Sequence, residues 1–283
     1  MIGELFVGEL TINLFLQNFS TPIITMLFII ITMLGDPFFW IIISAVFFWW
    51  EKEEISMKIA TIIFFNAIIL GILKYTIMRP RPDIPILEEF TTEKAFPSGH
   101  ASILTTIYSF FEKKMKRKEK IILIIIILIN GISRLYLGVH YLSDILFGIL
   151  LGYCIGKIIL RYENKLEKIR LKLKENRKKV IPFLLLLTTI IILTIPNKLF
   201  LAIMLIGYFI GYLLHNKMIV KTKIKNKIIY SIVGIIILII IGDTATKTNI
   251  IISGILFLIG GIFITWIWPI IINKIELKLK TKL

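Results

Sequence analysis

The sequence predicts an all-α integral membrane protein, and three observations lead to this fold class. Hydrophobic residues make up 57% of the 283-residue chain and charged residues 18%, with a mean hydropathy of +0.87; soluble domains average about 45–50% apolar and about 25% charged residues. The apolar residues form blocks of about 14 to 23 residues, and a helix needs roughly 20 to cross a bilayer core. The single cysteine, Cys154, lies inside such a block, so we expect a buried side chain and no intrachain disulfide. A soluble enzyme, a disordered chain and a disulfide scaffold are excluded.

Apolar runs between helix breakers predict ten membrane spans. Gly, Asp and Pro residues between the runs disfavour continuing a helix. The first six spans are expected at residues 21–34, 37–50, 58–78, 99–111, 119–136 and 140–160. Four more are expected at residues 181–195, 198–214, 228–242 and 250–272. The first, second and fourth spans fall short of the usual minimum of about 17 residues, so flanking residues or a thinned bilayer must complete them.

The charged stretch after the sixth span marks the best domain boundary. We expect residues 1–160 to form a six-span core, residues 161–179 a basic cytoplasmic linker, and residues 180–283 a four-span membrane region of unknown role. The Ile- and Leu-rich spans of this last region are typical of packing or lipid-facing helices. A substrate or partner domain is the alternative.

Basic residues predict the orientation of the spans. The net charge is +16, but the basic residues cluster between apolar blocks rather than along one soluble face, which argues against nucleic-acid binding. The N-terminal segment holds Glu4 and Glu9 and no Lys or Arg, unlike a cleaved signal peptide, so we expect it to be retained in the membrane interface. With the N-terminus inside, 27 of the 34 basic residues fall in inner loops. The positive-inside rule therefore predicts that both termini are cytoplasmic.

A first candidate segment carries basic residues at the outer end of the third span. It runs Lys74-Tyr-Thr-Ile-Met-Arg79-Pro80-Arg81-Pro82, and its prolines predict that the helix unwinds before Arg81. Cations here could bind an anion. Cations at span ends also serve as membrane anchors, which is the alternative for this segment alone.

A second segment, Phe96-Pro97-Ser98-Gly99-His100, directly precedes an apolar run. Pro, Ser and Gly in this position are typical of a helix N-terminus, where free backbone N–H groups favour an anion. In the simpler alternative, Ser98 is only an N-cap and His100 a polar residue of the first turn.

A third segment runs from Ser133-Arg134 to His140 and Asp144, ending one span and opening the next. His140 and Asp144 are four residues apart, so on one helix the carboxylate reaches one imidazole nitrogen and leaves the other as a nucleophile or base. A helix-stabilising pair is the alternative, but a carboxylate inside a membrane span is costly and usually functional.

The expected topology brings all three segments to one outer face. Positive charge for a phosphate would come from Lys74, Arg81 and Arg134, and hydrogen-bond donors from Ser98 and Gly99. His100 and His140 could divide the nucleophile and acid roles. We see no metal-ligand set and expect no metal or other cofactor.

These motifs resemble those of the type 2 phosphatidic acid phosphatase superfamily, which are Lys-x6-Arg-Pro, Pro-Ser-Gly-His and Ser-Arg-x5-His-x3-Asp. They match here in residue, spacing and order, over about the first 160 residues, at Lys74 to Pro82, Pro97 to His100 and Ser133 to Asp144. The resemblance implies a six-helix core and a metal-independent phosphoryl transfer through a phosphohistidine. His140 would attack phosphorus, Asp144 would orient and support it, and His100 would protonate the leaving oxygen and then activate water. The phosphate would be held by Lys74, Arg81, Ser98, Gly99 and Arg134.

The expected substrate is a lipid phosphate or a polyprenyl (isoprenoid) diphosphate, attacked at the outer membrane face. One alternative is a lipid phosphotransferase that uses the same phosphohistidine. Another is a non-enzymatic lipid-binding or transport protein, although binding alone does not require the set His100, His140 and Asp144. A haloperoxidase, whose anion site is similar, is disfavoured because this chain is embedded in the membrane.

Other polar residues are weaker candidates. Arg79, in a second Arg-Pro pair out of register, could supplement the site, and Asp36 is a candidate accessory residue on the same face. We expect Asp243 and Lys247 to be solvated outer-loop residues, and His215, on the inner side, to be non-catalytic.

Overall fold

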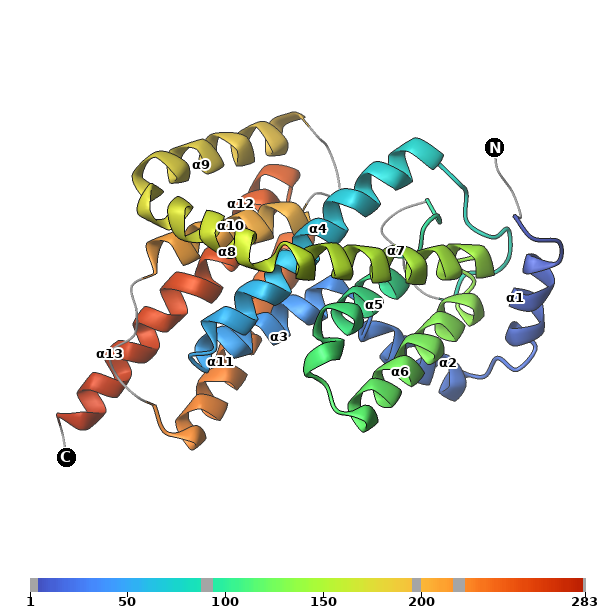
Figure 1. Ribbon diagram of the computed structural model, residues 1–283, viewed down its shortest axis with the longest axis horizontal. Helices are drawn as coiled ribbons and strands as arrows, with labels where there is room; N and C mark the ends of the chain where they lie inside the picture. The colour runs from blue at the N-terminus through green and yellow to red at the C-terminus, as the bar shows by residue number, and fades with distance from the viewer. Residues whose placement is uncertain (1–4, 88–93, 195–199, 216–221, 282–283) are drawn as a thin grey trace. The chain divides into compact units, whose positions relative to one another are not determined.

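The computed structural model of the chain describes residues 5–87, 94–194, 200–215 and 222–281 (Figure 1). The described residues are helical apart from loops and one isolated antiparallel bridge between Pro80 and Lys94. This confirms the all-α class. The chain forms two compact units, one of Met1–Trp40 with Thr61–Glu163 and one of Ile41–Ala60 with Asn164–Leu283.

The helices follow the apolar blocks of the sequence closely. In the first half they are α1 (Glu9–Gln17), α2 (Pro22–Met33), α3 (Pro37–Trp49), α4 (Glu53–Ile77), α5 (Gly99–Phe111), α6 (Arg117–Tyr136) and α7 (Leu142–Arg161), with the 3-10 turn η1 (Glu112–Lys114) between α5 and α6. In the second half they are α8 (Glu163–Glu175), α9 (Arg177–Thr194), α10 (Phe200–Leu214), α11 (Ile224–Thr246), α12 (Ile250–Ile262) and α13 (Trp268–Lys280), with the π-helical turn η2 (Phe263–Ile267) between α12 and α13.

Several helices are long and apolar enough to cross a bilayer, so this is a multi-pass membrane protein. Among the described residues they are α4, α7, α11 and the 31-residue stretch Ile250–Lys280. A fifth candidate is the bent pair α2 and α3. The division into six plus four spans is not confirmed.

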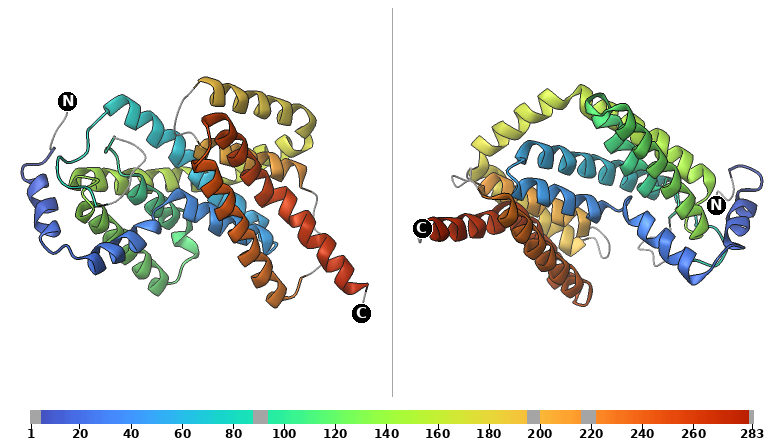
Figure 2. Two further views of the ribbon diagram at one scale, coloured as in Figure 1. Left: turned by 180° about the vertical axis from the view of Figure 1, so that it is seen from behind. Right: turned by 90° about the horizontal axis from the view of Figure 1, so that it is seen from below.

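The expected spans 21–34 and 37–50 are two short helices joined by a bend. α2 and α3 meet at an angle of 53° at a short break, as in a broken span or a re-entrant loop (Figure 2). α2 lies beside α6. Trp40 Nε1 donates to the Leu34 carbonyl at 2.8 Å and pairs a backbone group that the break frees.

The N-terminal helix α1 packs against the C-terminal end of α6 and the N-terminal end of α7. Three polar residues spaced by four, Glu9, Asn13 and Gln17, lie on one face of α1. Asn13 donates to the carbonyls of Leu135 (2.8 Å) and His140 (2.9 Å). The expected topology placed the N-terminal segment at the other end of these helices, and the contacts of Asn13 correct that expectation.

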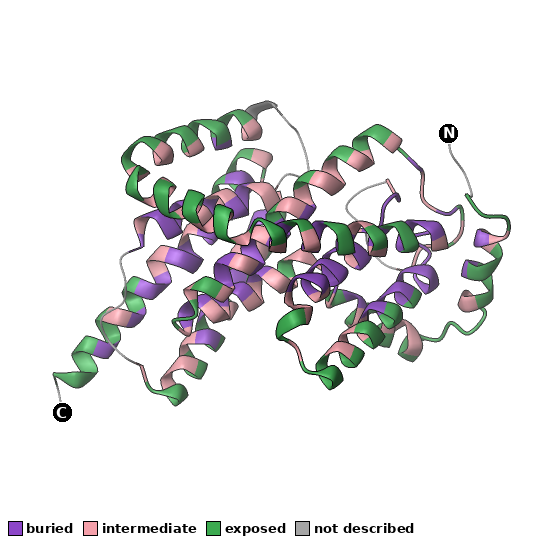
Figure 3. Cartoon of the chain, in the orientation of Figure 1, coloured by how far each residue is buried: buried purple, intermediate pink, exposed green. Residues whose placement is uncertain are grey.

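Glycines let α5 and α7 pack backbone to backbone. A Cβ at Gly148 would lie 2.6 Å from the Ser98 carbonyl oxygen, and one at Gly152 would lie 2.2 Å from that of Ser102. The contacts advance together along both helices, so α5 and α7 run parallel and their N-termini lie at the same end. α5 is buried along most of its length (Figure 3). This packing places Ser98 and His140 at one end of the helix pair.

Cys154, on α7, is exposed rather than buried. It lies two residues from Gly152, roughly 200° around the helix at 3.6 residues per turn. An apolar block in a membrane helix has one face toward protein and another toward lipid, which composition alone does not separate.

The second unit contains α10 and α12, packed in the same glycine-dependent way. A Cβ at Gly207 would lie 2.2 Å from the Leu258 carbonyl oxygen, and one at Gly261 would lie 2.1 Å from that of Met204. The charged stretch expected as a linker forms the helix α8 with no buried residue. Residues 41–60 belong to this unit too: Trp49 Nε1 donates to the Ile264 carbonyl at 2.8 Å.

Candidate active site

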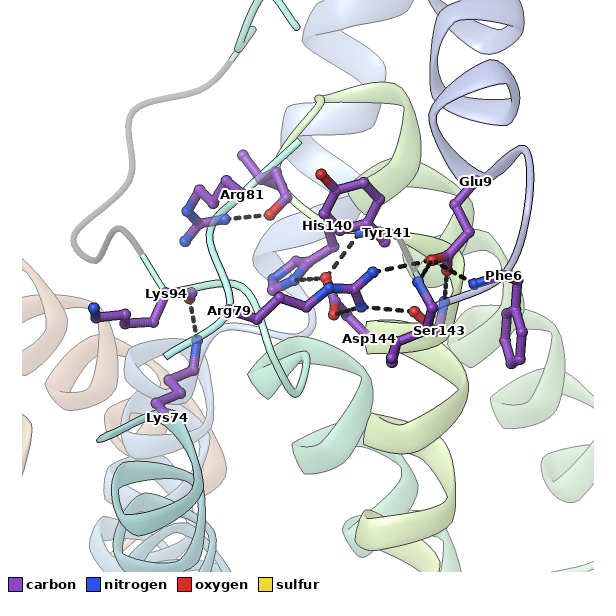
Figure 4. Close-up of polar contacts among 12 residues, drawn as sticks. Phe6, Glu9, Lys74, Arg79, Arg81, Lys94, His140, Tyr141, Ser143 and Asp144 are labelled. Carbon is purple, nitrogen blue, oxygen red and sulfur yellow. Dashed lines mark hydrogen bonds and ion pairs between the residues drawn. The ribbon is translucent and has the colours of Figure 1, made fainter. Parts of the chain in front are cut away.

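The candidate site lies where α4 and α6 end and α5 and α7 begin (Figure 4). α4 ends at Ile77, and Met78 follows with a φ of 53°, a left-handed conformation that stops a helix. The next residues run extended, with the Ala95 N–H donating to the Arg79 carbonyl at 2.9 Å. The Ser98 N–H donates to the Asp144 carbonyl at 2.9 Å. These bonds connect the first and third segments of the sequence to the second.

His140 and Asp144 form the centre of the site. Their side chains are buried, with His140 Nδ1 3.4 Å from Asp144 Oδ2. The Tyr141 N–H donates to the same carboxylate oxygen at 2.8 Å. We expected His140 and Asp144 to pair within one helix, and this is wrong because His140 lies before α7. The Asp144 side chain instead points back past the N-terminus of α7 to reach His140. The contact itself is as expected, with Nδ1 toward the carboxylate and Nε2 free of it.

Three predicted cations are fixed around this pair. Lys74 Nζ donates to the Lys94 carbonyl at 2.9 Å, and Arg81 Nη1 donates to the Val139 carbonyl at 2.5 Å. Arg134 is buried, and its Nη1 donates to Thr32 Oγ1 at 2.6 Å. The cations therefore come from the end of α4, the following loop and the end of α6.

Burial, and then the positive charges of Arg134, Arg81 and Lys74, hold the pKa of His140 well below its usual value of 6.5. A smaller contribution comes from His100. Each cation disfavours a further positive charge on the imidazole. His140 is therefore neutral in the resting site at physiological pH.

Ser98, Gly99 and His100 stand at the N-terminus of α5, as predicted. Ser98 is the N-cap, but its side chain makes no capping hydrogen bond. Its Oγ is buried and has no hydrogen-bond partner in the described part of the chain. Gly35, in the break between α2 and α3, lies so close that a Cβ there would be 2.7 Å from His100 Cβ. The break between α2 and α3 thus contacts the second histidine directly.

Sequence reasoning missed Glu9 and underestimated Arg79. The Arg79 guanidinium is fully buried and donates to Asp144 Oδ1 at 2.5 Å, to Ser143 Oγ at 2.6 Å and to Glu9 Oε2 at 2.9 Å. The signal for Glu9 was the spacing of Glu9, Asn13 and Gln17, which puts three polar side chains on one face of a short apolar helix.

The remaining candidates lie elsewhere or have local roles. Asp36 Oδ1 accepts the Phe38 N–H at 2.6 Å at the start of α3, and its charge interacts with that of Arg134. Asp243 and Lys247 form an exposed pair at 2.7 Å. His215 is buried against Phe48 in the second unit. Within the described ranges no group of three or more His, Cys, Asp or Glu side chains is placed to hold a metal ion.

Comparisons with known proteins agree with the motifs. A family model described as the PAP2 superfamily matches residues 56–168. Phosphatidylglycerophosphatase B of Bacillus subtilis is 31% identical over 143 residues, covering 47% of this chain and 70% of the relative. Undecaprenyl-diphosphatase of Sulfolobus acidocaldarius is 29% identical over 157 residues, covering 52% and 76%.

The structure of Aquifex aeolicus LpxE is similar with a TM-score of 0.50 at 27% identity, over 57% of this chain and 100% of that one. The relatives named above are lipid phosphatases, and the family model covers the candidate-site residues from Lys74 to Asp144. The chain belongs to the PAP2 superfamily of membrane phosphatases.

Proposed function

We propose that this protein hydrolyses a lipid phosphate or a polyprenyl diphosphate, without a metal ion, through a phosphohistidine on His140. The observation that supports this most is the environment of His140. Asp144 faces its Nδ1, and the charges of Lys74, Arg81 and Arg134 all act on it. A neutral imidazole among three cations is suited to attack a phosphate anion that those cations hold.

In this proposal the reaction has two steps. His140 Nε2 attacks phosphorus and the bond to the lipid oxygen breaks, while Asp144 supports the positive charge that develops on the ring. His100 protonates the leaving oxygen and then takes a proton from water, which attacks the phosphohistidine and releases phosphate. Ser98 Oγ, the Gly99 N–H and the three cations stabilise the charge on the equatorial oxygens.

The names of the relatives and the membrane location support the proposed substrate class. One relative is a phosphatidylglycerophosphatase and another an undecaprenyl-diphosphatase. In both names the phosphate belongs to a lipid, and a site at the ends of membrane helices suits a substrate that stays in the bilayer. We propose residues 1–160 as the catalytic core, residues 161–179 as a basic cytoplasmic segment, and residues 180–283 as an accessory membrane region.

The test is phosphate release by purified protein in detergent with EDTA, comparing a polyprenyl diphosphate with phosphatidic acid. We expect release that survives EDTA and falls to background in His140→Ala. His215→Gln is the matched control, because it removes a buried histidine of the second unit. Added glycerol as acceptor separates hydrolysis from phosphotransfer. Release by His140→Ala at the wild-type rate would contradict the proposal.

We further propose that the site and α1 face outside and that the C-terminus is cytoplasmic. Residues 1–51 contain no Lys or Arg, so moving α1 outside leaves the excess of basic residues on the inner side unchanged. The test is labelling of intact cells with an impermeant maleimide in a Cys154→Ser background. Asn18→Cys, exposed beyond α1, should be labelled, and Lys116→Cys, exposed before α6, should not. The reverse pattern would place the site inside.

A further inference from the structure

A buried ion network lies behind the His140–Asp144 pair, on the side away from the histidine (Figure 4). The Arg79 guanidinium lies between two carboxylates, 2.5 Å from Asp144 Oδ1 and 2.9 Å from Glu9 Oε2. All three side chains are buried, with exposures of 0% for Arg79 and Asp144 and 1% for Glu9. Charges buried this deeply are retained only where their partners are held in place.

The two oxygens of Asp144 are divided between the two neighbours. Oδ1 accepts from Arg79, while Oδ2 accepts the Tyr141 N–H at 2.8 Å and faces His140 Nδ1 at 3.4 Å. A carboxylate held at one oxygen by a charged donor cannot rotate freely. Arg79 therefore directs the other oxygen at the histidine.

Glu9 fixes Arg79 in turn, and it does so from a different helix. Its Oε2 accepts the Leu5 N–H at 2.8 Å and the Phe6 N–H at 3.2 Å, and its Oε1 accepts the Ser143 N–H at 2.5 Å. Burial raises the pKa of Glu9, but the hydrogen bonds from Ser143, Phe6 and Leu5 outweigh burial and lower it below 4.5. Glu9 is thus a carboxylate that connects α1 to the start of α7 and to Arg79.

We propose that Arg79 and Glu9 are positioning residues for catalysis, which hold Asp144 at the angle and charge that His140 needs. The proposal rests on the proposed function, in which Asp144 supports His140. Arg79 differs from the three cations around His140 because its guanidinium contacts Asp144, Ser143, Glu9 and the Tyr141 ring, and because its side chain is fully buried. The trio carries one net negative charge, which favours positive charge on the attacking ring.

A purely structural role, in which the network only attaches α1 to the fold, makes a different prediction. It would lower thermal stability without changing the turnover of the molecules that remain folded. Positioning changes kcat, and it leaves KM largely unchanged because neither residue contacts the substrate. It also couples the two residues, since Glu9 acts through Arg79.

The test compares Arg79→Gln, Arg79→Lys, Glu9→Gln and the double variant Arg79→Gln/Glu9→Gln, with kcat and KM normalised to folded protein. For Arg79→Gln we expect kcat to fall about 10- to 100-fold, as it does on losing a residue that orients a metal ligand in a metalloenzyme. KM should stay within about threefold. Arg79→Lys should recover part of kcat, and the double variant should lose no more than Arg79→Gln alone.

Each other outcome has a definite meaning. A raised KM with kcat retained would make Arg79 a phosphate ligand and overturn the proposal, as would unchanged kcat in both Arg79→Gln and Glu9→Gln. If Arg79→Gln does not fold, the nearly isosteric Glu9→Gln decides, because it must lower kcat at constant KM. His140→Ala run in parallel separates the two proposals: if it keeps full activity the proposed function fails, whereas if it alone is inactive only the positioning proposal fails.

Discussion

The α5–α7 pair of the first unit and the α10–α12 pair of the second are built alike, but they differ at their N-terminal ends. In both pairs a glycine lets one backbone approach the other, with a Cβ at Gly152 or Gly207 falling 2.2 Å from a carbonyl oxygen. Small residues are the general means of close helix packing in membranes. The packing itself therefore carries no chemistry.

The N-caps of the two pairs show where the difference arises. Asn249, at the start of α12, accepts the Ile252 N–H at 3.0 Å with its own side chain. Ser98, at the start of α5, makes no such bond, and its Oγ is buried without a partner among the described residues. One cap stabilises its own helix, while the other leaves its hydroxyl available for the phosphate of the proposed function. The comparison supports the proposal that the phosphate site uses a helix N-terminus whose cap is not used by its own helix.

The largest expected effect on stability and activity comes from adding a methyl group at the glycines where two helix backbones touch. Gly152→Ala must push α5 away from α7, which costs about 1–3 kcal/mol of stability, and displacing Ser98 and His100 by about 1 Å should lower kcat/KM roughly 100-fold. Gly207→Ala imposes the same strain in the second unit. We expect it to lower the melting temperature similarly but to leave kcat/KM of the folded protein unchanged. An equal loss of kcat/KM in Gly207→Ala would show that the second unit supports the site.

A loss of activity of similar size, but without the loss of stability, is expected at Ser98. Ser98→Ala removes a donor to the phosphate, which should lower kcat/KM on the order of 100-fold, while the melting temperature stays unchanged because no capping bond is lost. Kinetics and thermal unfolding in detergent measure both. A lower melting temperature with normal kinetics would instead make Ser98 an ordinary cap.

The positions of the three motif segments could be predicted because each lies at the end of an apolar run, where the sequence indicates that a helix begins or ends. The ends of α4 and α6 and the starts of α5 and α7 fall within a few residues of the expected boundaries, so Lys74, Ser98 and Asp144 could be assigned to one face. Apolar runs and helix-breaking residues are local features, so they can be read from the sequence without knowing the tertiary fold.

The bent pair α2–α3 and the helix α1 could not be placed in the same way. The positive-inside rule gives no information on residues 1–51, which contain no Lys or Arg. A break at Gly35-Asp36 has the same appearance in the sequence whether it is an outer turn or a bend within one crossing. Glu9 was missed because its partner Arg79 lies 70 residues away, and such pairing depends on the tertiary fold.

The buried histidines of the two units, His215 and His140, differ in what shifts their pKa, and this difference predicts the pH dependence of the activity. Burial lowers the pKa of His215, with Glu53 opposing and Lys174 adding to the shift, whereas burial and the positive charges of Arg134, Arg81 and Lys74 all lower the pKa of His140. Neutral His140 then persists below pH 6.5, so the acidic limb of kcat/KM should lie below that value. Removing a positive neighbour favours the imidazolium, so Arg134→Gln should move the limb upward by on the order of one pH unit. An unmoved limb in the residual activity of Arg134→Gln would mean that His140 does not set it.

The smallest effect is expected at Asn249, the N-cap whose side chain bonds its own helix. It serves as the counterpart to Ser98. Asn249→Ala removes an N-cap side chain from α12, which typically costs about 1 kcal/mol, so thermal unfolding should begin a few degrees lower. Phosphate release per folded molecule should be unchanged, because Asn249 uses its side chain on its own helix. Asn249→Asp, which keeps an acceptor at the same position, should retain the wild-type melting temperature. If Asn249→Ala instead lowered kcat/KM as Ser98→Ala does, the start of α12 would take part in function and the contrast between the two caps would fail.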